Sequence, residues 1–182
     1  MNRYMSRSFI GNKRRTQTRG NSLLEFTLVG IPLICVLITT FELSRGMWSY
    51  QTLAYAVNAG VRYSVVHGQD CANAPNACTV TISQIASIIR SAGVGLPPDL
   101  VTLTFTDANG SATTCSLGDC IATYNSSAWP PSSANAPGQD VRISGIYAFR
   151  SAMLMFWPGA GRPMGPPGVI GLSADSRECV QY

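Results

Sequence analysis

The pattern of hydrophobic and polar positions begins with a long uncharged stretch. The sixteen residues from Phe26 to Phe41 carry no charge, and in an extension back to Leu23 only Glu25 interrupts the apolar run. A helix needs about 20 mainly apolar residues to cross a hydrocarbon core about 30 Å thick. The run therefore predicts a membrane-spanning helix with the Glu25 carboxylate at or near the membrane. Pro32 predicts a kink or local loosening within this helix.

The helical pattern continues beyond the run. Apolar residues recur at steps of three and four, close to a heptad seam. One helix from Asn21 to Val66 would be about 69 Å long, so its second half must pack on its own domain or on another copy of the helix. Packing on its own domain is the favoured interpretation. The seam consists of Leu43, Met47, Tyr50, Ala54, Val57, Val61 and Val65.

The rest of the chain reads as a small α+β domain, with a short helix and an antiparallel sheet. Apolar spacing predicts a helix from Ile82 to Ile89 that ends near Gly93. Alternation of apolar and polar residues predicts strands over 101–106 and 141–150. Residues 169–179 are a candidate for a third strand. Residues 107–110 form a predicted turn, and 125–138 and 157–168 are predicted loops. The apolar cluster 153–157 is expected in the core, with an exposed contact patch as the alternative.

The charge of the chain is concentrated at its start. Residues 1–20 contain six basic residues and no acid, whereas 21–182 contain seven basic and nine acidic residues. Basic arms can bind nucleic acid. A basic cluster directly before an apolar span, however, is typical of the cytoplasmic side of a membrane. The pattern therefore favours a cytoplasmic N-terminus and an external C-terminal domain, without a nucleic-acid partner.

Five of the six cysteines follow the span, where an oxidising compartment favours disulfides. The economical pairings are Cys71 with Cys78 and Cys115 with Cys120, because each closes a short loop; other pairings remain open. Cys179 is left over. A zinc site is the rival interpretation, but the chain has no Cys-x-x-Cys pair and a single histidine.

The sequence gives no positive sign of catalysis or of a cofactor. His67, the single histidine, falls at a predicted helix exit and is interpreted as a capping or surface residue. The chain has no Gly-x-Ser-x-Gly motif and no phosphate-binding glycine loop. We therefore expect a protein that is not an enzyme.

The start of the apolar run resembles the leader of a type IV prepilin of the Flp kind. Basic residues precede Gly20, four residues separate this glycine from Glu25, and Phe26 follows. The resemblance implies cleavage by a membrane-embedded prepilin peptidase between Gly20 and Asn21, with Glu25 as the fifth mature residue. A secretory signal would instead place a small-residue cleavage site after the apolar run, and none is evident there.

A closer resemblance covers residues 19–66. The successive segments Arg19-Gly20, Glu25-Phe26, Ile31-Pro32-Leu33, Glu42-Leu43-Ser44-Arg45-Gly46 and Ala59-Gly60-Val61-Arg62-Tyr63 are similar to the TadE-like minor pseudopilins of the tight-adherence (Tad) pilus system. The resemblance implies a pilin-like architecture in the bacterial inner membrane, with pilin and pseudopilin subunits and the pilus assembly machinery as partners. It also implies a cytoplasmic leader (1–20), a transmembrane and extended helix (21–66), and a periplasmic or extracellular domain (67–182).

Three classes of function remain in competition. The first is a minor pseudopilin that assembles through its helix, with Glu25 and Phe26 as its recognition residues. The second is a periplasmic binding module on an ordinary signal anchor, and the third is an anchored enzyme. Cleavage after Gly20 separates the first class from the other two.

Overall fold

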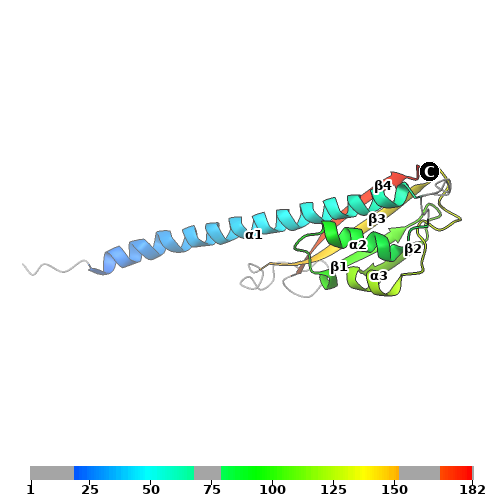
Figure 1. The fold of residues 1–182 in the computed structure, drawn as a ribbon. Coiled ribbons are helices and arrows are strands. Elements are labelled where there is room, and N and C mark those ends of the chain that lie inside the picture. Colours follow the sequence, from blue (N-terminus) through cyan, green and yellow to red (C-terminus); the bar gives the residue numbers. More distant parts are fainter. Residues whose placement is uncertain (1–18, 68–78, 152–168, 182) are drawn as a thin grey trace, which may run out of the picture. The chain divides into compact units, whose positions relative to one another are not determined.

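The computed structural model describes residues 19–67, 79–151 and 169–181 (Figure 1). The described residues fall into two compact units, divided between Ile38 and Thr39. The fold is α+β, as the sequence predicts. Its helices are α1 (Arg19–Val65), α2 (Ile82–Ala92) and α3 (Leu117–Thr123), with a 3₁₀ turn η1 (Pro98–Leu100). Its strands are β1 (Val101–Thr106), β2 (Ala112–Ser116), β3 (Asp140–Arg150) and β4 (Val169–Cys179).

Helix α1 is one continuous element of 47 residues. It continues through Pro32 without a break, so the loosening expected there does not end the helix. It ends at Val65, one residue before the predicted end. The Arg45 guanidinium lies 3.1 Å from the Glu42 carboxylate, an ion pair between residues three positions apart on the helix.

The four strands form one antiparallel sheet in the order β2-β1-β3-β4. The three predicted strands are confirmed, whereas β2 was not predicted. Its sequence, Ala112-Thr113-Thr114-Cys115-Ser116, lacks apolar alternation, and only Cys115 in it is buried. The predicted turn before it is confirmed: the Asp107 carboxylate accepts hydrogen bonds from the backbone N–H groups of Asn109 and Ser111.

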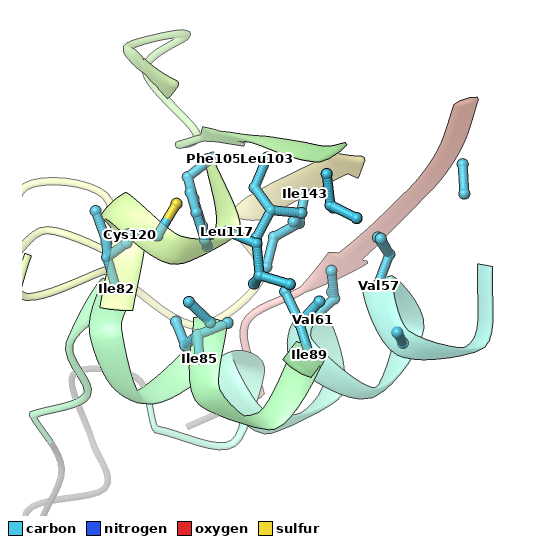
Figure 2. Close-up of a cluster of buried hydrophobic side chains, with 14 of the residues drawn as sticks. Val57, Val61, Ile82, Ile85, Ile89, Leu103, Phe105, Leu117, Cys120 and Ile143 are labelled. Carbon is cyan, nitrogen blue, oxygen red and sulfur yellow. The ribbon is translucent and has the colours of Figure 1, made fainter. Parts of the chain in front are cut away.

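The core lies within unit 39–182, between helices and sheet. Figure 2 shows apolar side chains of α1, α2 and α3 meeting those of β1 and β3. The predicted helix α2 begins with a capping box, in which Thr81 and Gln84 each bond the other's backbone N–H. Its C-cap is Gly93, as expected. The buried side chains at the centre include Val57, Val61, Ile85, Ile89, Leu103, Phe105 and Ile143.

The seam of α1 divides into two parts. Val57, Val61 and Val65 are fully buried, which confirms that the second half of the extended helix packs on its own domain. Leu43, Met47 and Tyr50 are exposed. The described residues therefore do not bury the first half of the seam. The apolar pattern is continuous along the helix, but its covering by the domain is not.

Candidate functional site

The N-terminal part of α1, within the first unit, presents apolar side chains in every direction. All large apolar residues from Leu23 to Ile38 are exposed. Among the described residues, this is the one helix long and apolar enough to cross a membrane. A helix that is apolar all round requires lipid or other helices to cover it. The apolar side chains of this helix therefore need lipid or the helices of other chains to cover them.

Glu25 and Phe26 lie together near the start of this apolar helix. Both are exposed, and no described side chain forms an ion pair with Glu25. The Phe26 ring lies beside Gly30: a Cβ built on Gly30 would be 3.8 Å from Phe26 Cε1, an ordinary contact. Gly20 and Asn21 belong to α1 by their backbone, and their cleavage stays a prediction.

Among the described cysteines of the second unit, two form a covalent link. Cys115 at the end of β2 is bonded to Cys120 in α3, with a Cα–Cα distance of 5.4 Å, so the predicted pair is present. Cys120 is fully buried. The other predicted pair, Cys71–Cys78, lies outside the described residues, as does the apolar cluster 153–157.

Cys179, the cysteine left without a predicted partner, interacts with a carboxylate on the neighbouring strand. β3 and β4 pair in a register that sets Cys179 opposite Asp140, and the thiol donates to Asp140 Oδ1 at 3.0 Å. This hydrogen bond lowers the pKa of Asp140, helped by the nearby Arg177 guanidinium. The same bond, together with the negative charge of Asp140, raises the pKa of the Cys179 thiol.

The Asp140–Cys179 pair belongs to an exposed charged cluster on β3 and β4. Arg142 and Arg177 are directly opposite in the sheet register. Each pairs diagonally with an acid on the other strand, Arg142 with Asp175 and Arg177 with Asp140. The cluster lines a polar hollow of about 390 Å³, in which the two positive charges already have carboxylate partners. Because solvent screens exposed pairs of this kind, they contribute little to stability.

The described residues contain no group of three or more His, Cys, Asp or Glu side chains placed to hold a metal ion. His67 sits at the end of α1. Its backbone N–H donates to the Ser64 carbonyl, and its Nδ1 lies 2.6 Å from the Tyr63 carbonyl oxygen. These contacts agree with the predicted capping role.

Comparison with known proteins gives one match. The family model of TadE-like proteins matches residues 20–62, which confirms the resemblance over this stretch. The matched residues begin at the predicted cleavage glycine and include Glu25, Phe26, Arg45 and Gly60. No curated protein and no solved structure matches the chain. The matched stretch lies entirely within α1, and α1 is long and apolar enough to be a single membrane anchor.

Proposed function

We propose that this chain is a minor pseudopilin, a structural and assembly component of a Tad-type type IV pilus. The observation that carries the proposal is the TadE-like match, which begins at Gly20 and covers the helix whose apolar side chains are exposed on all sides. A subunit that enters a helical assembly in a membrane requires such a surface, because lipid covers it before assembly and neighbouring helices cover it afterwards.

In this proposal a prepilin peptidase cuts the chain between Gly20 and Asn21. Residues 1–20 form the cytoplasmic leader, 21–66 the transmembrane and extended helix, and 67–182 the external domain. Because the basic residues of the leader stay on the cytoplasmic side, the domain lies in the periplasm or outside the cell. The Cys115–Cys120 disulfide supports this external location of the domain, since disulfides persist in oxidising compartments.

Glu25 has a specific role in the proposed assembly. Cleavage creates an α-amino group at Asn21, about 6 Å along the helix axis from Glu25. A charge in an apolar setting is costly unless it is paired. We infer that Glu25 receives the α-amino group of a neighbouring subunit, while Phe26 adds apolar contact beside the pair. Such a pair sets the axial register between subunits even where its net stabilisation is small.

The mass of the mature protein tests the proposal. Protein purified from membranes of a host with a Tad system should begin at Asn21. Gly20→Val should leave full-length precursor, because the side chain would keep the backbone from the close approach that glycine permits. Gly30→Val is the matched control: the same substitution ten residues further along α1 should leave cleavage intact.

The same measurement distinguishes the competing functions. A wild-type chain that remains uncut, or one cut after the apolar run, would reject the pseudopilin and favour a binding module on a signal anchor. Normal cleavage of Gly20→Val would reject this glycine as the processing site.

A further inference from the structure

An apolar groove lies within unit 39–182, between α1 and the adjoining ends of β3 and β4. Its volume is about 490 Å³. One wall consists of Leu43, Met47 and Tyr50 on α1, and the other of Phe149, Ile170 and Leu172 on the two strands. Leu43 is 70 % exposed, Met47 53 % and Ile170 43 %, which leaves a continuous apolar lining accessible from outside. This lining includes the part of the seam that the domain does not cover.

Arg45 holds the two walls together. Its guanidinium donates to the backbone carbonyl of Arg150 at the end of β3 and lies 4.8 Å from the centre of the Phe149 ring. The same group pairs with Glu42 one turn earlier on α1. Gly46 adds no side chain between the walls; a Cβ there would touch the Phe149 ring at 3.8 Å. The groove is therefore formed by contacts within the unit and does not require a ligand to shape it.

The position of the groove along α1 relates it to the membrane. The sixteen uncharged residues from Phe26 rise about 24 Å, short of the about 30 Å of a typical hydrocarbon core. Four further residues, to Arg45, complete that thickness in an upright helix. Leu43 then lies at the depth of the acyl chains, and Met47 lies about 3 Å beyond them, among the headgroups.

The positions of two aromatic side chains are consistent with this depth. Trp48 and Tyr50 are both exposed and fall in the turn that would meet the headgroups. Tryptophan and tyrosine are enriched at membrane interfaces, where an apolar ring and a polar edge are both accommodated. The paired Glu42 and Arg45 bring no net charge to the boundary.

We propose that this groove binds an acyl chain of a phospholipid in the outer leaflet, so that the base of the domain rests on the bilayer. The lining of the groove starts at Thr39, inside the uncharged run that ends at Phe41, so an acyl chain in the groove would continue the covering of apolar surface along α1. If water filled the groove instead, its apolar surface would stay in contact with water, which is unfavourable. The inference rests on the membrane span and not on the pilus role.

Photocrosslinking of the full-length protein in phospholipid vesicles tests the inference. A benzoylphenylalanine is placed at Met47, at Ile170 or, as control, at Val94, which is 69 % exposed but does not line the groove. We expect adducts with the mass of the vesicle phospholipid at Met47 and Ile170, in several-fold higher yield than at Val94. Equal yields at all three positions, adducts to a second copy or within the chain, or no lipid adduct would overturn the inference.

Tryptophan fluorescence gives a second measurement that needs no substitution in the groove. Phospholipids brominated near the headgroup end of the acyl chain should quench wild-type fluorescence more than they quench Trp48→Phe. Bromine at the chain terminus should produce a smaller difference between the two proteins. Equal quenching of the two proteins by the headgroup-proximal label would contradict the proposed depth.

Discussion

Gly60 in α1 lies directly against Ile89 in α2. A Cβ built on Gly60 would come within 2.6 Å of Ile89 Cγ1 and 2.8 Å of its Cδ1. Carbon atoms pack best at about 3.5–4.0 Å, so the two helices approach at a distance that only glycine permits. Ile89 is almost completely buried and has little room to move aside. The contact thus fixes the extended part of α1 to the domain.

Gly60→Ala should therefore destabilise the protein. Overpacking of a core destabilises a protein by about 1–3 kcal/mol. The higher helix propensity of alanine offsets about 1 kcal/mol of this loss. We expect a net loss of up to about 2 kcal/mol in the free energy of unfolding. Denaturant unfolding of the full-length protein in detergent, followed by circular dichroism, measures the loss.

Gly46→Ala is the matched control in the same helix. A Cβ there would lie 3.8 Å from the Phe149 ring, which is an ordinary contact. The substitution should be neutral or stabilising by up to about 1 kcal/mol. If both alanine variants unfold alike, the close approach at Gly60 does not limit the packing of α1.

The sequence predicted those elements whose apolar spacing is long and regular. Strands β1 and β3 and helix α2 were found in this way, whereas β4 was predicted without a regular apolar alternation. β2 was missed because it is a polar edge strand that is held by its partner β1 and by the preceding turn. α3 has only seven residues, too few for a periodic signal. Its available sign was Ser116 followed by Asp119, a cap that the structure contains.

The candidate surfaces also divide into those that the sequence could predict and those that it could not. The exposed apolar helix and its early acid are local in sequence and could be predicted. The groove could not be predicted, because Met47 and Ile170 line the same groove only once β4 has paired with β3. The Asp140–Cys179 contact likewise depends on the strand register, in which the two residues are 39 positions apart.

The Cys115–Cys120 disulfide should stabilise the external domain. Closing this short loop reduces the entropy of the unfolded chain by an amount equivalent to about 2 kcal/mol. Replacing both cysteines by serine should lower the free energy of unfolding by about that value or more, because burial of a hydroxyl at position 120 adds to the loss. Denaturant unfolding under non-reducing conditions measures the difference.

Peptide mapping without reduction tests the pairings themselves. It should recover the peptide that links Cys115 to Cys120, and by the same loop argument a peptide that links Cys71 to Cys78. Free thiols at all four positions in protein from its native compartment would reject both bonds. That result would also remove the support that the disulfide gives to an external location.

Asp140 should suppress the reactivity of Cys179. Its carboxylate accepts the thiol hydrogen bond and raises the pKa of Cys179, so little reactive thiolate forms at mildly alkaline pH. Asp140→Asn should lower that pKa and speed alkylation of Cys179 by iodoacetamide. Site-resolved mass spectrometry across a pH series measures the rate. Asp175→Asn is the control, because it removes an acid of the same cluster that does not bond the thiol; equal acceleration in both variants would contradict a specific effect of Asp140.

The pKa shifts of Asp140 and Cys179 affect the stability of the fold at opposite ends of the pH range. The pKa of Asp140 is lowered in the folded protein, so its contribution is present above the ordinary aspartate pKa and is lost as the pH falls through the lowered value. The pKa of Cys179 is raised, so its contribution is present below the ordinary thiol pKa and is lost as the pH rises through the raised value. Unfolding of Asp140→Asn should vary less with pH in both regions than unfolding of the wild type.

Glu25 carries the sharpest prediction of the proposed assembly. If its carboxylate pairs with the α-amino group of a neighbouring subunit, Glu25→Gln should still enter the membrane and be cleaved after Gly20. It should then fail to assemble with pilin partners, because the amide leaves the apolar-bound amino group without a counter-charge. Glu42→Gln is the matched control: that carboxylate pairs with Arg45 in its own chain. Co-purification with pilus components, together with counts of pili by electron microscopy, gives the readout. Wild-type association and normal piliation in Glu25→Gln would show instead that this acid lies at the membrane interface and faces the lipid headgroups.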